Sequence, residues 1–183
     1  MANLFSFANR TISDNISVVD CSPDMRTITI YTDGSCKKPN DVGGWAFVIF
    51  NQNKEKIAED SCKLKKCTNN TAEMIAIISG ITKAMALDNM KKVKLYVYSD
   101  SQYCIKGATS WITGWKQRNW KTKTGDPVKN KELWLQIDAL LKEVTVEFVW
   151  TKGHADDTNN CLVDDMAGKT WREEEIKPAA PTS

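Results

Sequence analysis

The sequence predicts an α/β fold, a mixed five-stranded sheet with helices on its faces. The first third of the chain contains short strand-like segments joined by short connections, which is typical of an antiparallel meander. Two later strand-like segments are separated by long helical stretches, and such connections join parallel strands through right-handed crossovers. With 183 residues, 42% apolar and 26% charged, the chain has the composition of a single globular domain.

Five segments have the pattern of strands. The first, TITIYT at 27–32, alternates between apolar and polar residues, and we expect it to end at Asp33-Gly34 because Asp-Gly is a turn signal. The other strands are predicted at 44–50, 55–64, 94–99 and 144–150. The first three form the meander, and the last two are expected to pair in parallel.

Three segments have helical periodicity, at about 71–87, 130–142 and 159–171. Asn70 and Glu73 have the spacing of a capping box at the start of the first helix. Apolar residues recur along that helix at i, i+3, i+4, i+7 and i+11, which predicts one buried face. This face consists of Met74, Ile77, Ile78, Ile81 and Met85.

Composition excludes a membrane protein and indicates a reducing compartment. No stretch approaches the roughly 18 uninterrupted apolar residues of a membrane span, and the N-terminus lacks the pattern of a secretory signal. We expect a mobile leader at 1–25, one domain at 26–172, a disordered tail at 173–183 and a cytoplasmic location. The six cysteines form no CxxC pair and are predicted to be free thiols rather than zinc ligands; they are Cys21, Cys36, Cys62, Cys67, Cys104 and Cys161.

Four acidic positions can act together. Asp33 and Asp100 follow the first and fourth strands, and the carboxyl ends of neighbouring parallel strands meet at one edge of a sheet. Glu73 lies near the start of the first helix. The last helix carries Asp164 and Asp165 on opposite shoulders of its apolar stripe, and the pattern does not choose between them. The alternative for each acid is a local role as a turn residue, a cap or a solvated side chain.

A cluster of these acids needs protons or cations. Two like charges at 4 Å repel by about 4 kcal/mol at an effective dielectric near 20. Sites rich in carboxylates and poor in histidine suit hard ions such as Mg²⁺ or Mn²⁺. Two such ions, about 3.5–4 Å apart, would clamp the attacking and leaving oxygens of a phosphoryl displacement.

Residues 106–131 form a basic segment that the near-neutral total of +2 conceals. Its one acid is Asp126, and three of the seven tryptophans are interleaved with its cations. Such a segment suits phosphate and sugar contacts, which position a duplex without reading its sequence. The alternative is a solvated helix with Trp111 and Trp115 packed on the body. The cations are Lys106, Lys116, Arg118, Lys121, Lys123, Lys129 and Lys131, and Lys116, Arg118, Trp120 and Lys121 are predicted to contact the substrate.

Five motifs, in this order, resemble the ribonuclease H family, type 1. They are YTDGSC (31–36) with Gly43-Gly44, TNNTAE (68–73), YSDSQY (98–103), the stretch WITGWKQRNWKTKTGDPVKNKELW (111–134), and TKGHADD (151–157) followed by Asn160 and Asp164. The stretch at 111–134 resembles the basic protrusion of bacterial members. The resemblance covers about residues 26–172.

The resemblance implies a ribonuclease H-like fold and an endoribonuclease that cleaves the RNA strand of RNA–DNA hybrids. It implies 5′-phosphate and 3′-hydroxyl products, little sequence preference, and two Mg²⁺ ions, with Mn²⁺ as a substitute. It also implies that Asp164, rather than Asp165, completes the metal ligands with Asp33, Glu73 and Asp100. His154 is expected to move protons or to assist product release, because its ordinary pKa is near neutrality.

The resemblance further implies a substrate surface. Hydrogen bonds near the minor groove are expected from Cys36, Asn40, Asn69 and Asn70, a contact to a DNA phosphate from Thr68, and a place near the active site for Asn160. The partner is the hybrid duplex, no membrane is involved, and we expect a monomer. The sequence departs from the family pattern at 38–42, at Thr71-Ala72 and at Lys106, which leaves details of strand recognition open. The alternatives are a catalytically inactive hybrid-binding module and a related nuclease that acts on DNA.

Overall fold

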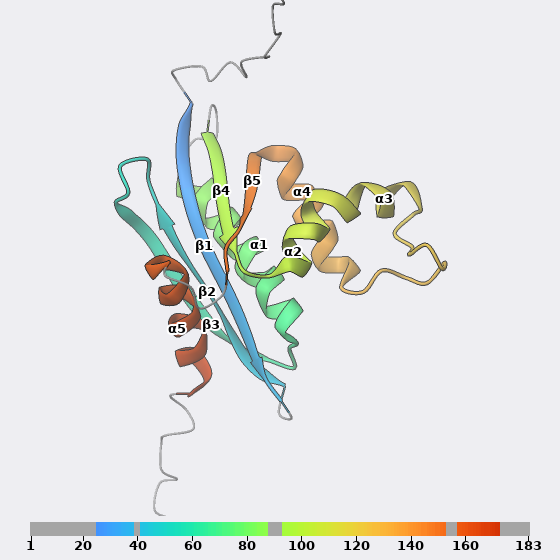
Figure 1. The fold of residues 1–183 in the computed structure, drawn as a ribbon, viewed down its shortest axis with the longest axis horizontal. Helices are drawn as coiled ribbons and strands as arrows, with labels where there is room; N and C mark the ends of the chain where they lie inside the picture. The colour runs from blue at the N-terminus through green and yellow to red at the C-terminus, as the bar shows by residue number, and fades with distance from the viewer. Residues whose placement is uncertain (1–24, 39–40, 88–92, 153–156, 173–183) are drawn as a thin grey trace, which may run out of the picture.

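A five-stranded sheet forms the centre of the molecule, in the computed structural model that describes residues 25–38, 41–87, 93–152 and 157–172. The strand order is β3-β2-β1-β4-β5. The predicted mixed sheet is confirmed, because β1, β2 and β3 pair antiparallel while β4 and β5 continue the sheet in parallel (Figure 1). The strands are β1 (Arg26–Lys37), β2 (Val42–Phe50), β3 (Lys56–Lys65), β4 (Val93–Ser99) and β5 (Thr145–Trp150).

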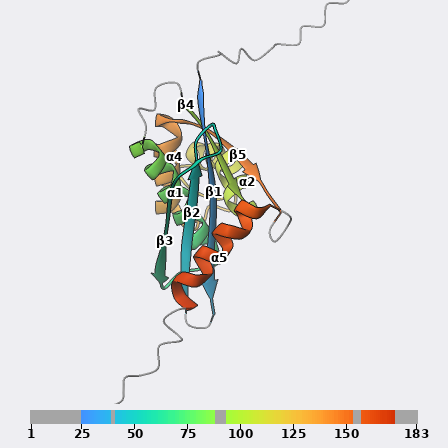
Figure 2. The same cartoon turned by 90° about the vertical axis from the view of Figure 1, so that its left-hand side faces the viewer.

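Helices cover both faces of the sheet. On one face α1 packs against β1 and β2 and also contacts α4, while α5 crosses the other face (Figure 2). No helix in the described part of the chain is long and apolar enough to cross a bilayer. The helices are α1 (Asn69–Leu87), α2 (Gln102–Lys106), the π-helical turn η1 (Gly107–Trp111), α3 (Ile112–Gln117), α4 (Lys131–Glu143) and α5 (Thr158–Arg172).

The main core lies between α1 and the sheet. Met74, Ile77 and Ile81, on the predicted apolar face of α1, are fully buried against β1 and β2, whereas Ile78 and Met85 are partly buried at the edge of this core. A smaller cluster lies on the opposite face, where α5 packs on the same two strands. Its members are Ala46, Val48, Val163 and Ala167. α1 and α5 therefore pack on opposite faces of β1 and β2. β1 carries Asp33, the first of the four acidic positions.

The predicted end of the first strand is wrong. β1 continues through Asp33 and Gly34 to Lys37, because its antiparallel pairing with β2 extends over Asp33↔Ala46 and Gly34↔Trp45. The parallel pairing with β4 stops earlier, at Tyr31↔Tyr98. Asp33 therefore lies just beyond the point where β1 and β4 separate, and the Asp-Gly pair is extended backbone rather than a turn.

The predicted start and cap of the first helix are also wrong. α1 begins at Asn69, and Thr68 caps it, since the Thr68 hydroxyl accepts from the Thr71 N–H at 3.2 Å. The Thr71 hydroxyl returns the contact by accepting from the Thr68 N–H at 2.8 Å. A threonine thus replaces the Glu of a standard capping box, and Glu73 lies in the second turn, where its carboxylate is available for other contacts.

Candidate active site

Three acidic side chains meet at the edge of the sheet where β1 and β4 separate. Single carboxylate oxygens of Asp33, Glu73 and Asp100 all lie within 4.8 Å of one another. They come from β1, from α1 and from the residue that follows β4. The structure thus brings together three of the four acids that the sequence singles out, and it does so with elements that are far apart along the chain.

A close approach of backbone to backbone brings two of these acids together. A Cβ atom on Gly34 would lie 2.2 Å from the Ala72 carbonyl carbon and 2.3 Å from the Glu73 nitrogen. Only glycine allows β1 to approach the start of α1 so closely. The separation of the Asp33 and Glu73 carboxylates is therefore set by the neighbouring glycine.

Gly34→Ala should lower both stability and any activity of the site. Overpacking of a rigid contact costs about 1–3 kcal/mol, and the displaced α1 would carry Glu73 away from Asp33. Denaturant unfolding measures the first effect. Gly114→Ala is the matched control, since a Cβ there meets only the end of the Arg118 side chain, at 3.0 Å, and alanine favours a helix. Equal stability of Gly34→Ala and wild type would contradict this account.

Burial and the charges of neighbouring carboxylates raise the pKa of two of these acids, Asp33 and Glu73, when no cation is bound. Burial, and then the charges of Asp100 and Asp164, raise the pKa of Asp33 to about 7, although the Gly34 backbone amide opposes the shift. The pKa of Glu73 is raised well above its ordinary value by burial and by the neighbouring carboxylates. Asp33 Oδ2 and Glu73 Oε2 have no hydrogen-bond partner among the described residues.

The two acids of α5 have different surroundings. Asp165 is 51% exposed at its side chain and pairs with Lys169 at 2.6 Å, as a surface acid does. Asp164 lies close enough to raise the pKa of both Asp33 and Glu73, although it is outside the group within 4.8 Å. Asn160, one helical turn earlier, is buried, and its Oδ1 has no partner among the described residues.

The backbone around Asp100 is anchored by the neighbouring strand, which the sequence analysis missed. The indole N–H of Trp150 donates to the Asp100 carbonyl at 3.1 Å, and Thr151 N donates to the Ser99 carbonyl at 3.1 Å. Ser101, not Asp100, caps α2. The sequence did contain a signal for this contact, namely Trp150 at the end of the fifth strand. The ends of neighbouring parallel strands lie side by side, so Trp150 is expected near the end of β4, where Asp100 lies.

A pocket of about 350 Å³ lies where the end of β1 meets the start of α1. The Asn69 side-chain oxygen accepts from the Cys36 backbone N–H at 2.8 Å and so joins the two elements. The pocket is lined by Cys36, Lys38, Thr68, Asn69 and Asn70. Four of the predicted substrate-binding residues therefore share one surface, whereas Asn40 and His154 lie outside the described residues, as do residues 1–24 and 173–183.

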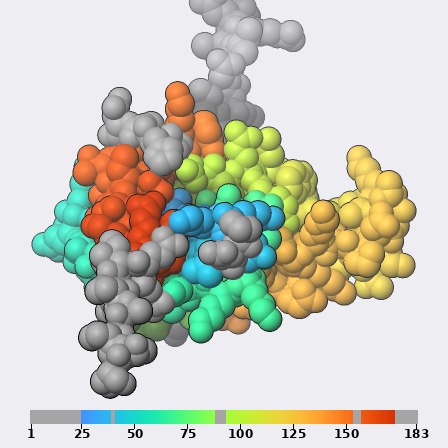
Figure 3. Space-filling model, turned by 90° about the horizontal axis from the view of Figure 1, so that it is seen from below, coloured from blue at the N-terminus to red at the C-terminus, as the bar shows by residue number. Residues whose placement is uncertain are grey.

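Within the basic segment, α3 and the loop that follows it project from the body, and we call these residues, 112–130, the protrusion. Figures 1 and 3 show it standing away from the sheet, on one side of the surface that β1, α1 and α5 form. Arg118 and Lys121 are exposed, and Trp120 is partly buried against the main core. Trp115 packs on Trp134 of α4, with ring centroids 5.3 Å apart. This ring therefore packs on the body, as the alternative interpretation of the basic segment predicted.

Comparisons with known proteins match most of the chain. The sequence profile of the RNase H family matches residues 25–172. A ribonuclease H of Treponema denticola is 40% identical over 150 residues, covering 76% of this chain and 94% of the relative. One of Chromobacterium violaceum is 43% identical over 143 residues, covering 78% and 92%.

Solved structures share the fold. LC9-RNase H1, described as a type 1 RNase H with the type 2 active-site motif, superposes with a TM-score of 0.68 at 23% identity, covering 78% of this chain and 71% of that one. LC11-RNase H1 in complex with an RNA/DNA hybrid superposes with a TM-score of 0.63 at 22% identity, covering 81% and 99%.

The mixed sheet and the acids at its edge are compatible with the class of metal-dependent nucleases, since carboxylates brought this close are stabilised by a hard cation or by protons. The family profile matches residues 25–172, and the two relatives are aligned over more than nine tenths of their own length, so the class can be narrowed to one family. The chain belongs to the ribonuclease H family.

Proposed function

We propose that this protein is an endonuclease that hydrolyses the RNA strand of RNA–DNA hybrids, leaving 5′-phosphate and 3′-hydroxyl ends. The observation that carries the proposal is the group formed by the buried Asp33 and Glu73 and the half-buried Asp100, whose carboxylate oxygens lie within 4.8 Å of one another. Membership of the family supports the substrate, as does the likeness to a structure that holds an RNA/DNA hybrid.

The acid cluster fits divalent cations. Two of its buried oxygens have no hydrogen-bond partner among the described residues, and an all-oxygen set of like charges favours hard ions. We propose that Asp33, Glu73, Asp100 and Asp164 hold two Mg²⁺ ions, with Mn²⁺ as a substitute. When bound, such ions lower the pKa of a coordinated water and neutralise charge on the leaving oxygen.

The protein's own groups position the reaction. The Trp150 indole and the end of β5 fix the backbone on which the Asp100 carboxylate is mounted. The pocket where β1 meets the start of α1 is the proposed place for minor-groove contacts that identify the RNA strand, from Cys36, Asn69 and Asn70, and for a DNA phosphate at Thr68. Asn40 is proposed to add a minor-groove contact. His154 is proposed to move protons near the site.

Selective cleavage tests the proposal. Purified protein is incubated with labelled RNA–DNA hybrid, double-stranded RNA and double-stranded DNA, each with Mg²⁺ or with chelator. Cleavage of the hybrid's RNA strand alone, abolished by chelator, is the expected result. Cleavage of DNA would favour a DNA-acting nuclease, and binding without cleavage would favour an inactive hybrid-binding module. Gel filtration tests the proposed monomer, and fractionation of cells tests the proposed cytoplasmic location.

Arg118→Ala/Lys121→Ala should weaken binding of the hybrid and make it less dependent on salt. Both side chains are exposed on the protrusion, and each phosphate contact contributes about 0.9 to the slope of log K against log[salt] on B-form DNA. A slope smaller by about 2 is expected from binding measured over a salt series. The control is Lys56→Ala on β3, where Lys56 pairs with Glu59 at 2.9 Å. An unchanged slope in the double variant would mean that these cations are only solvated.

A further inference from the structure

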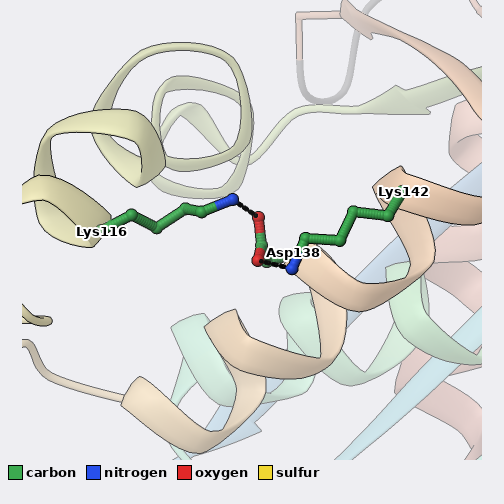
Figure 4. Close-up of polar contacts among 3 residues, drawn as sticks. All are labelled: Lys116, Asp138 and Lys142. Carbon is green, nitrogen blue, oxygen red and sulfur yellow. Dashed lines mark hydrogen bonds and ion pairs between the residues drawn. The ribbon is translucent and has the colours of Figure 1, made fainter.

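Outside the acid cluster, α4 carries a second kind of buried acid, Asp138, which belongs to none of the sequence motifs. Asp138 is 8% exposed and lies on the same face of α4 as the buried Trp134 and Ile137. Its two oxygens are held by two lysines, since Lys116 Nζ lies 2.7 Å from Oδ1 and Lys142 Nζ lies 2.8 Å from Oδ2 (Figure 4).

The two lysines differ in what they connect. Lys142 is one turn from Asp138 on the same helix, so this pair joins α4 to itself. Lys116 lies on α3, at the base of the protrusion, and Figure 4 shows its side chain extended across the space between α3 and α4. Burial raises the pKa of Asp138, but hydrogen bonds from the two lysines outweigh burial and hold the pKa below its ordinary value. The carboxylate is therefore charged and needs these partners.

Backbone hydrogen bonds at the end of α3 fix the direction in which the chain of the protrusion leaves this helix. Arg118 N donates to the Gly114 and Trp115 carbonyls, and Trp120 N donates to the Trp115 carbonyl at 2.7 Å. Trp115 packs on Trp134, one turn before Asp138 on α4. α4 contacts two adjacent residues of α3, since Trp134 packs on Trp115 and Asp138 pairs with Lys116. The exposed Arg118 and Lys121 follow directly after this short helix, so these two contacts position them.

We propose that Asp138 is a positioning residue that holds the protrusion toward the duplex through Lys116, which serves as a tether rather than as a phosphate contact. The proposal rests on the proposed function, because the protrusion is positioned for a hybrid. It assigns an acidic residue a favourable role in binding a polyanion.

Electrostatics alone predicts the opposite sign. Removing a negative charge from a protein tightens its binding to a polyanion. If Asp138 only added charge, Asp138→Asn would strengthen hybrid binding. As a tether, its loss releases α3 and weakens binding. The direction of the change therefore distinguishes the two roles.

Steady-state cleavage of the hybrid by Asp138→Asn and Glu143→Gln provides the test. Glu143 is an exposed acid on the same helix and is the matched control for charge. Asp138→Asn should raise KM about 3- to 10-fold with kcat unchanged, equivalent to about 0.7–1.4 kcal/mol, whereas Glu143→Gln should leave KM unchanged or lower it. A KM for Asp138→Asn that falls, or that equals that of Glu143→Gln, overturns the proposal.

Hydrogen exchange on the free protein gives a second test that needs no substrate. Lys116→Ala and Lys142→Ala each remove one cation from Asp138, but only the first breaks the ion pair between α3 and α4. Amide exchange over 112–121 should accelerate in Lys116→Ala and not in Lys142→Ala, while exchange in the β1 core stays at the wild-type rate in both. Equal exchange over 112–121 in the two variants would overturn the tether. A wild type that fails to cleave the hybrid would instead refute the proposed function and leave this measurement valid.

Discussion

Asp100→Asn should lose cleavage of the hybrid by about 100-fold or more while the metal-free protein becomes more stable. Substitution of groups that merely orient metal ligands costs about 10- to 100-fold, so loss of a proposed ligand should cost at least as much. Stability should rise because the Asp100 charge raises the pKa of both Asp33 and Glu73. Removing that repulsion should add about 1 kcal/mol, or about 2–4 °C in Tm for a domain of this size.

The two effects are measured separately, by cleavage with Mg²⁺ and by thermal unfolding with chelator. Asp165→Asn is the matched control, because Asp165 is an acid of α5 paired with Lys169 at the surface. It should keep wild-type cleavage and change Tm little. Wild-type cleavage by Asp100→Asn would remove this residue from the site. A lower Tm in Asp100→Asn would mean that the acids are not repelling one another.

The metal-free protein should lose stability as pH rises from 5.5 to 7, and divalent metal should restore this stability at pH 8. Asp33 has a pKa of about 7 in the folded protein, against an ordinary value of 3.8. A group whose pKa is raised on folding stabilises fully below its unfolded value, and this contribution is lost as pH rises through the folded value. The window is therefore pH 4 to 7, and Glu73, whose pKa is also raised, shifts stability in the same direction.

The expected loss from Asp33 between pH 5.5 and 7 is about 2 kcal/mol at 1.36 kcal/mol per pH unit, or about 4–8 °C in Tm. Added Mg²⁺ should raise Tm at pH 8 more than at pH 5.5, because protons compete for the same oxygens at low pH. Unfolding scans with chelator and with Mg²⁺ at both pH values measure this. Asp33→Asn should flatten the dependence, and a Tm that rises toward pH 8 without metal would contradict the pKa assignments.

The fold was largely predictable because strong local patterns mark its elements. The α1 face of Met74, Ile77 and Ile81 and the five strand segments were readable from periodicity, and the structure confirms them. Element ends were less predictable. The Asp33-Gly34 pair is a turn signal locally, but pairing with β2 overrides it, and Thr68 caps α1 through a partner that is not the expected acid.

The site was predictable as a set of residues but not as a geometry. The sequence pattern placed Asp33 and Asp100 after two strands and Glu73 near the start of a helix. Only the packed fold shows that one oxygen of each lies within 4.8 Å of the others. The close approach at Gly34 and the Trp150 hydrogen bond depend on long-range contacts that no local pattern reveals. Asp138 did leave a signal, since an acid on the apolar face of a helix needs a partner, but the sequence could not name Lys116.

The gathering of the acids from β1, α1 and the end of β4 has a consequence for how activity is acquired. No segment of the chain shorter than the span from β1 to β4 carries all three groups, so partly synthesised or partly folded chains lack a competent centre. Such long-range contacts form late and cooperatively. Hydrolysis should therefore switch on only with the native state, and a denaturant concentration that halves the folded population should halve the rate.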